Sequence, residues 1–542
     1  MSGTDKQAGE PRNKAVKTVS LIIFATAFSK ILGLVRDMVM AYLYGGSTEN
    51  AAMTVALDIP LSFFDIFFGA AILGVFIPVY NSFGKDGKDG KDGGDNRDNH
   101  EEKAEEFANV FLNFVILATG LLVLLGIVFA GQIVDVMAAG AGEETKRLTV
   151  YLLRIMLPMI VFTGSVFTVT GILQSKGEFL APALVSSFSN LCVIIYFLAF
   201  NRHFGIYGLA VAYLISWMIQ LLTLAVPLSR KKHKYKFKID FKNPAFMQAA
   251  KLAPPVLAGS WLIPMSKQIA NRFSTVYEDY ALVIAAFGRA WSLFLIITGI
   301  LAYGVCNYIF PKLARNANSG GGEQEFAETL KNGLSGLIFV IAPVACIAFV
   351  LREEAVAVLF MRGAFTPDIA EASAGMFAFL TPAMLTFSLI EIMNRVFYSK
   401  KLVKFPMIAA VAAVGVNFAL CYIFIELAGL APVYITVANL ICQAVALLIL
   451  TIAMRSKVRG VLNKKFTANI AKIVLSSGIA LIITLLLYFA LANNAFESNL
   501  LKNIGTSVII LIAGSAVYLG ANIVLRTSEA RAILKILKRE AG

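Results

Sequence analysis

Apolar stretches of about 20–30 residues recur along the whole chain, and their length limits the fold more than any other feature of the sequence. A helix of about 20 apolar residues crosses the ~30 Å hydrocarbon core of a bilayer, whereas the strands of a membrane barrel are shorter and alternate apolar with polar residues. Apolar residue types make up 58% of the chain and charged types 15%, against about 25% charged residues in soluble proteins. The sequence therefore predicts an all-α polytopic membrane protein.

Fourteen membrane spans are predicted from these stretches. Several exceed about 25 residues, so tilted, kinked or protruding helices are expected. The predicted spans are 17–43, 52–82, 104–131, 147–175, 182–201, 205–228, 247–275, 280–312, 326–350, 368–398, 406–427, 430–454, 467–491 and 501–525.

An internal repeat organises these spans. Its two copies lie six spans apart, and because six is even, both copies enter the membrane in the same sense, as a parallel repeat. This pattern predicts two six-helix lobes around a central cavity, followed by two C-terminal helices outside the repeat. The matched positions are Pro158 with Pro382, Ser175-Lys176 with Ser399-Lys400, Pro182 with Pro406, and Gly205 with Gly429.

The predicted domain boundaries follow the repeat and the distribution of charge. Lysine and arginine are concentrated in alternate loops, which predicts that both termini are cytoplasmic. The Gly-Lys-Asp repeats between two spans are of low complexity and predict a disordered loop. The predicted order is a cytoplasmic tail (1–16), an N-lobe of spans 1–6 (17–228) with a disordered loop at 84–103, a basic cytoplasmic linker (229–246), a C-lobe of spans 7–12 (247–455), spans 13–14 (467–525) and a basic amphipathic cytoplasmic tail (526–542).

Ionised side chains occur within the first two predicted spans, where a charge near the bilayer centre costs ~3 kcal/mol. The first span contains Lys30, Arg36 and Asp37, and the second contains Asp58 and Asp65. Positions seven apart on a helix differ by only about 20° in direction, so Lys30 shares a face with Asp37, and Asp58 with Asp65. Such residues normally face a bundle interior or a wet cavity, so the two spans predict the wall of a polar chamber.

The second lobe carries charges in its own predicted spans. Lys267, Arg272 and Arg289 are cationic, and Glu391 and Arg395 are spaced to pair on one helix face. Exposed to lipid, the ten or so charges of both lobes would cost roughly 30 kcal/mol in total. For Arg272 and Arg395, which lie near helix ends, a salt bridge between helices or a snorkelling side chain is the favoured alternative to a binding role.

Several motifs resemble those of a known family. The segment Phe28-Ser-Lys-Ile-Leu-Gly-Leu-Val-Arg-Asp37 resembles the opening motif of the MurJ (MviN) lipid II flippases, which belong to the multidrug, oligosaccharidyl-lipid and polysaccharide exporter superfamily. Later segments are similar to further motifs of that family, and the resemblance covers nearly the whole chain. These segments are Ala286-Phe-Gly-Arg289, Phe360-Met-Arg-Gly-Ala-Phe365, and Asn394-Arg-Val-Phe-Tyr398 with Pro406.

The resemblance implies a flippase that moves lipid II, the undecaprenyl-pyrophosphate-linked peptidoglycan precursor, from the inner to the outer leaflet of the bacterial inner membrane by alternating access. Carried over by position, Lys30, Arg36 and Arg289 would bind the pyrophosphate with Asp37 beside Arg36, and spans 13–14 would form a groove for the lipid tail. Two further cations of the predicted chamber, Lys267 and Arg272, are also assigned to substrate binding.

The chain departs from the family pattern on its second span, where many members carry an arginine at the position of Asp65. The chamber is thus less positive than in those members. Asp58 and Asp65, together with Glu391 and Arg395, are therefore candidates for ion coupling or gating. A polysaccharide-unit flippase or a cation-coupled drug exporter of the same superfamily is the alternative function, and a membrane scaffold or an enzyme acting on lipid carriers is a more distant one.

Catalysis is not expected from this sequence. It has no Gly-x-x-x-x-Gly-Lys-Ser/Thr loop for ATP, and its three histidines, His100, His203 and His233, are all predicted to lie in loops. We expect no catalytic residue, metal site or cofactor apart from a coupling ion of unknown identity. The expected partners are the lipid-linked precursor and membrane lipids, with no nucleic acid, and the expected functional form is a monomer.

Overall fold

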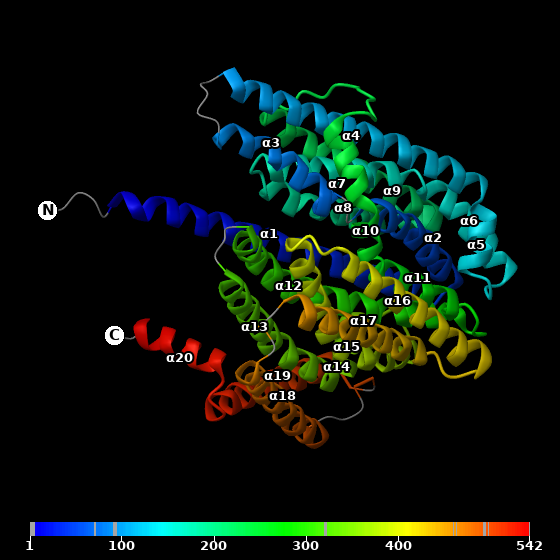
Figure 1. Ribbon diagram of the computed structural model, residues 1–542. Coiled ribbons are helices and arrows are strands. Elements are labelled where there is room, and N and C mark those ends of the chain that lie inside the picture. Colours follow the sequence, from blue (N-terminus) through cyan, green and yellow to red (C-terminus); the bar gives the residue numbers. More distant parts are fainter. Residues whose placement is uncertain are drawn as a thin grey trace. The chain divides into compact units, whose positions relative to one another are not determined.

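The computed structural model is helical throughout, with no strand among the residues that it describes (Figure 1). Those residues are 6–69, 72–89, 95–318, 322–458, 460–461, 463–491, 495–496 and 498–540. In chain order the helices, with π-helical segments marked η, are α1 (Lys6–Tyr44), α2 (Thr48–Phe64), η1 (Asp65–Gly69), η2 (Ile72–Phe76), α3 (Ile77–Asp89), α4 (Asp95–Val128), α5 (Ala130–Met137), α6 (Glu143–Met156), α7 (Met159–Ser175), α8 (Leu180–Ala199), α9 (Asn201–Arg230), α10 (Pro244–Ser260), α11 (Leu262–Ser274), α12 (Tyr280–Asn318), α13 (Gly322–Val350), α14 (Arg352–Phe360), α15 (Pro367–Ser399), α16 (Lys404–Cys421), η3 (Tyr422–Leu427), α17 (Tyr434–Lys457), α18 (Lys464–Leu491), α19 (Leu500–Val524) and α20 (Ser528–Glu540).

Eleven helices in the described part of the chain are long and apolar enough to cross a membrane, or twelve if α6 and α7, bent by 43°, form one span. The described helices therefore do not confirm the predicted count of fourteen spans. Predicted span 17–43 lies within the single helix α1, which carries Lys30, Arg36 and Asp37 among its apolar residues. Predicted span 247–275 is divided at Trp261 between α10 and α11; Pro264 follows this break and lacks the N–H group that would bond to Ser260, the last residue of α10.

The chain forms two compact units, which we describe separately. Unit 1 comprises Met1–Met40, Val55–Asp135 and Lys146–Leu257, and unit 2 comprises Ala41–Thr54, Val136–Thr145 and Ala258–Gly542. The predicted linker at 229–246 lies wholly within unit 1. It does so because its backbone is bound by α4, as described below.

In unit 1, α7 packs against α4 and α9, and α8 packs against α9. Gly164 allows the close approach of α7 to α4, since a Cβ at this position would lie 2.7 Å from Val115. The apolar side chains Val166, Leu173 and Leu224 belong to the core between α7 and α9. The helices that carry the charged side chains of unit 1 thus belong to a closely packed bundle.

A segment that we call the strap, residues 231–243, lies against α4 and has no regular secondary structure, with turns at residues 231–232 and 241–242. The Asn113 side-chain amide donates to the carbonyls of Lys236 and Lys238, at 3.2 and 3.1 Å, and the Asn109 amide donates to the carbonyl of Lys234 at 3.0 Å. These bonds satisfy backbone groups of a segment that has no secondary structure of its own. They hold the strap against unit 1.

The start of the strap is buried beside an ion pair. The Lys176 ammonium donates to the Glu105 carboxylate at 2.7 Å, and the His233 Nδ1 atom lies 3.7 Å from the same oxygen. The His233 side chain is 1% exposed, and burial lowers its pKa below the usual 6.5. The imidazole is therefore held in its neutral form.

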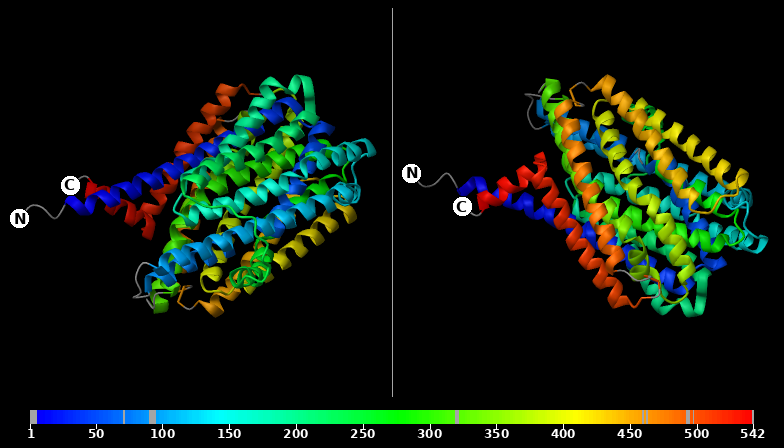
Figure 2. Two further views of the ribbon diagram at one scale, coloured as in Figure 1. Left: turned by 90° about the horizontal axis from the view of Figure 1, so that it is seen from above. Right: turned by 90° about the horizontal axis from the view of Figure 1, so that it is seen from below.

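In unit 2, α15 packs against α12, α13 and α17, around a buried aromatic cluster that includes Phe287, Trp291, Phe294 and Phe387. Helices α18 and α19 lie side by side (Figure 2) and pack on α13 through a second apolar cluster. The two helices that follow the sequence repeat are therefore part of unit 2.

Matching helix ends confirm part of the sequence repeat. The segments Ser175-Lys176-Gly177 and Ser399-Lys400-Lys401 each end a helix at the serine and place the lysine at the C-cap. The third residue of each segment is left-handed, with φ of 78° at Gly177 and 56° at Lys401. The same short sequence thus stops α7 and α15 in the same way.

The two copies differ at their prolines. Pro158 lies immediately before α7, at the bend between α6 and α7, whereas Pro382 lies inside the continuous helix α15. A proline removes one backbone donor, and the surrounding packing decides whether the helix breaks or continues.

Three predictions outside the spans have mixed outcomes. The loop predicted to be disordered at 84–103 is helical at both ends, since α3 continues to Asp89 and α4 begins at Asp95; residues 90–94 lie outside the described residues. His100 and His203 lie in α4 and α9, so the prediction that they lie in loops is wrong. Both differences arise because helices extend readily beyond their apolar spans, each added residue gaining a backbone hydrogen bond. The predicted C-terminal helix is present as α20.

Candidate functional site

Arg36 of unit 1 is held by polar side chains from two helices. Its Nε and Nη2 atoms donate to Asp37 Oδ1 at 3.1 and 2.8 Å, and its Nη1 atom donates to Asn190 Oδ1 of α8 at 3.1 Å. The guanidinium carbon also lies 5.8 Å from the centre of the Tyr213 ring of α9. These contacts fix the plane of the guanidinium, and 28% of the side chain stays exposed.

A second layer of polar groups orients Asn190. Its amide donates to the carbonyl of Ser29 at 3.2 Å. The Ser29 hydroxyl in turn donates to the carbonyl of Ala183 at 3.1 Å and contacts the Ser187 hydroxyl. Helix α1 is thus joined to α8 through Ser29 and through Arg36.

The sequence analysis missed Asn190. An amide within the predicted span 182–201 is the kind of signal that singled out the charged residues, because an unpaired polar group in hydrocarbon is costly. Only charged residues were taken as candidates, so this uncharged amide was left out.

The three other candidates of unit 1 have different environments. Asp58 of α2 is 4% exposed and interacts electrostatically with Arg36. Asp65 is exposed and begins the π-helical segment η1, and Lys30 is exposed on α1. The predicted shared face of Asp58 and Asp65 therefore corresponds to one buried and one exposed carboxylate.

Arg289 of unit 2 lies on α12 and is 8% exposed. Its guanidinium carbon lies 5.8 Å from the centre of the Phe360 ring at the end of α14. A ring face attracts a cation without selecting the direction of its N–H groups. Phe360 begins the motif Phe360–Phe365 that the sequence analysis singled out.

The remainder of that motif forms a turn against residues 41–54 of unit 2. The backbone N–H of Ala364 donates to the carbonyl of Tyr42 at 2.9 Å. Gly363 has a φ of 60°, and a side chain here would collide with Tyr42. Glycine is therefore required at this turn, and the motif places the Phe360 ring beneath Arg289.

The remaining candidates of unit 2 lie beside carboxylates or are partly buried. Arg395 Nη1 donates to Glu391 Oε2 at 2.8 Å within α15, and Arg272 Nη2 donates to Glu426 Oε1 of η3 at 3.3 Å. The Arg272–Glu426 pair joins two helical segments, as the predicted alternative to a binding role, whereas Arg395 pairs with Glu391 within one helix, as their spacing predicts. Lys267 is partly buried on α11.

Comparison with known proteins decides the family. A sequence model of the family described as lipid II flippase MurJ matches residues 40–505. The chain belongs to the MurJ family. The matched range includes every charged candidate except Lys30, Arg36 and Asp37, which precede it.

Curated MurJ relatives match over most of their length. A probable lipid II flippase MurJ of Thermotoga maritima is 27% identical over 96% of this chain and 99% of its own length. Another from Bdellovibrio bacteriovorus is 26% identical over 78% of this chain and 79% of its own length.

Solved structures support the same fold. A lipid II flippase MurJ in an inward closed conformation matches with a TM-score of 0.75 and 25% identity, over 93% of this chain and 99% of that chain. A multidrug resistance MATE family transporter in an inward-facing conformation, from the wider MOP superfamily, matches with a TM-score of 0.61 and 16% identity, over 79% of this chain and 95% of that chain. The second likeness concerns the fold alone.

Proposed function

We propose that this membrane protein translocates lipid II from the inner to the outer leaflet by alternating access, with Arg36 and Arg289 binding the pyrophosphate. The observation that carries this assignment is Arg36, an arginine on an apolar helix whose guanidinium is oriented by Asp37 and Asn190 and remains partly exposed. Membership of the MurJ family supplies the substrate class.

The chemistry of the head group explains the use of arginine. A pyrophosphate that crosses hydrocarbon must exchange its water for fixed donors, and a guanidinium offers a planar donor fork whose charge is permanent. The polyprenyl tail needs no polar path. We assign it to the apolar surface of α18 and α19, where Phe489, Leu501 and Val524 are almost fully exposed.

Several finer features belong to this proposal. Both termini are cytoplasmic, the protein acts as a monomer in the bacterial inner membrane, and the chain transports without catalysing a reaction. Asp58, buried and close to Arg36, is the group that we assign to ion coupling or gating, since a carboxylate beside the cation site changes its net charge by taking up a proton or a cation. A coupling ion of unknown identity is a further proposed partner.

Translocation of lipid II in proteoliposomes tests the assignment. Arg36→Ala and Arg289→Ala should each lower the initial rate by about tenfold or more, because one charge-assisted hydrogen bond contributes about 1.5–3 kcal/mol. Arg202→Ala, which removes an exposed arginine at the start of α9, is the matched control and should retain the wild-type rate. Wild-type rates in both binding-site variants would refute the pyrophosphate assignment.

A further inference from the structure

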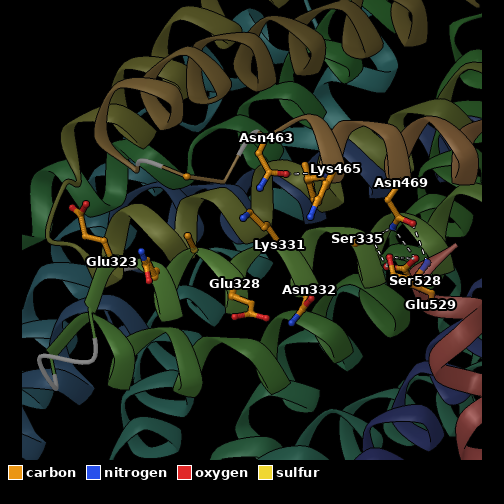
Figure 3. Close-up of a pocket in the computed structure, with 14 residues that line it drawn as sticks. Glu323, Glu328, Lys331, Asn332, Ser335, Asn463, Lys465, Asn469, Ser528 and Glu529 are labelled. Atoms are coloured by element: carbon orange, nitrogen blue, oxygen red, sulfur yellow. Dashed lines mark hydrogen bonds between the residues drawn. The ribbon is translucent and has the colours of Figure 1, made fainter.

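A polar cavity of about 550 Å³ lies within unit 2, at one end of its membrane helices (Figure 3). Its walls come from the start of α13, from residues 460–469 around the start of α18, and from the first two residues of α20. Because α13 and α18 begin here and α19 has just ended, the cavity opens at the level where a bilayer places its head groups.

One end of the cavity is closed by a hydrogen-bonded group of side chains. Asn469 Nδ2 donates to Glu529 Oε2 at 2.9 Å, and Asn469 Oδ1 accepts from the backbone N–H of Ser528 at 2.9 Å. Ser335, which is 4% exposed, also donates to the Glu529 carboxylate. The negative charge of Glu529 is therefore engaged, and the same bonds fix the start of α20 to α13 and α18.

Two lysines from different helices line the cavity, which is also lined by Glu323 and Glu328. Figure 3 shows Lys331 of α13 and Lys465 of α18 pointing toward the same part of the pocket, next to Asn463. The Asn463 side-chain oxygen accepts the backbone N–H of Phe466 at 2.9 Å, which leaves its NH₂ group to donate. In the same view Glu328 extends from α13 in a different direction from Lys331, and Glu323 lies at the far end.

Two ammonium groups from different helices repel each other unless an anion lies between them. Within the described residues, neither lysine makes a salt bridge with a carboxylate. Lysine binds phosphate oxygens as a compact point charge, and basic pockets between membrane helices on the cytoplasmic side are suited to phospholipid head groups. The cavity has room for such a head group.

We propose that this cavity binds a phosphoryl anion between Lys331 and Lys465, carried by an anionic phospholipid of the adjacent leaflet or by a soluble phosphate. The bound anion bridges α13 and α18, next to the side chains that hold α20. This site is separate from the residues assigned to lipid II, and its occupant serves as a structural ligand rather than as cargo.

Thermal unfolding of the purified full-length protein in detergent micelles tests this proposal. The three probes are dihexanoyl phosphatidylglycerol, dihexanoyl phosphatidylcholine and inorganic phosphate, each titrated while the unfolding midpoint is measured. The test variant is K331A/K465A. The matched control is K457A/K464A, which removes two exposed lysines near the same helix ends that do not line the cavity.

Phosphatidylglycerol should raise the midpoint of the wild type and the control, and K331A/K465A should need about tenfold more lipid for the same shift. An equal response to inorganic phosphate would identify a soluble anion as the source and retain the site. The proposal fails if neither anion shifts the wild-type midpoint, if phosphatidylcholine acts as well as phosphatidylglycerol, or if K331A/K465A responds like the control. Should K331A/K465A prove unfolded, K331Q/K465Q provides the same comparison with longer polar side chains.

Discussion

Arg36 of unit 1 and Arg289 of unit 2 are both arginines on apolar helices, but their surroundings hold them in different ways. Arg36 donates to two side-chain oxygen atoms, on Asp37 and Asn190, which define the direction of each N–H group. Arg289 is more deeply buried and lies over the face of Phe360, which attracts its positive charge. We infer that Asp37 and Asn190 set the orientation of Arg36, and that the Phe360 ring contributes to holding the charge of Arg289.

Lysine substitutions provide the sharpest test of this contrast. Arg36→Lys should lower lipid II translocation by about tenfold or more, nearly as much as alanine, because an ammonium cannot reproduce a planar fork that spans two partners. Arg289→Lys keeps the charge over the ring and should lose only about threefold. The measurement is the initial translocation rate in proteoliposomes, normalised to inserted protein. Equal losses at the two positions would remove the distinction.

Asn190→Ala should have the next largest effect, a loss of about fivefold in translocation rate. It removes one oriented acceptor of Arg36 and leaves the charge in place, and such a bond contributes about 1 kcal/mol. Ser189→Ala, on the neighbouring exposed residue of α8, is the control. If Asn190→Ala is as active as this control, the polar partners of Arg36 are not what positions it.

Phe360→Leu tests the contact between Arg289 and the Phe360 ring. Leucine keeps the position apolar but removes the ring face, so the translocation rate should fall about two- to fivefold, in line with a cation–ring interaction of about 0.5–1 kcal/mol. Phe349→Leu is a matched control, since Phe349 lies under Arg352, 5.2 Å from its guanidinium carbon and away from the candidate site. A drop of the same size in both variants would point to packing instead of the cation.

The smallest expected effect is a pH response of opposite sign in the two units. The pKa of His233 in unit 1 is lowered by burial, with Glu105 and Lys176 adjacent, so its contribution to strap binding is present above pH 6.5 and is lost as pH falls toward its folded-state pKa. The pKa of Glu354 in unit 2 is raised from 4.5 by burial, so its contribution is present below pH 4.5 and is lost as pH rises through its folded-state pKa.

Amide hydrogen exchange measures both responses in one experiment. After correction for the intrinsic rate, residues 231–243 should lose protection between pH 7.5 and 5.5, and His233→Gln should abolish that change. Protection around α14 should instead increase as pH falls from 7.5 toward 4.5, and Glu354→Gln should remove the increase. Parallel changes in the two units would contradict the assignment of these two groups.

The sequence revealed the parts of the molecule that depend on local pattern. Apolar length predicted membrane helices, charge within those helices predicted Arg36 and Arg289 as candidates, and equal spacing predicted that Ser175-Lys176 and Ser399-Lys400 would end equivalent helices. Each of these signals lies within a short stretch of chain. The cost of placing a charge in hydrocarbon and the gain from burying an apolar face can be judged from such a stretch alone.

Contacts between distant segments were not predictable from the same signals. Asn190 is 154 residues from Arg36, and Tyr42 is 321 residues from Gly363, so their pairing depends on tertiary packing. The span count differs from the prediction partly because the chain breaks at Trp261, between α10 and α11, within a stretch that apolar length alone predicts to be one helix.

The strap has a consequence for how freely its sequence can change. Asn109 and Asn113 donate to its main-chain oxygens, which every residue type supplies. These hydrogen bonds therefore do not depend on the side chains at Lys234 and Lys236. The side chains at these two positions can therefore change, whereas Tyr235, whose hydroxyl donates to Asn113 at 2.7 Å, and Lys238, which pairs with Glu106 at 2.7 Å, bind α4 through their own side chains. Replacing the two asparagines, by contrast, would release the strap without altering a single residue of its own.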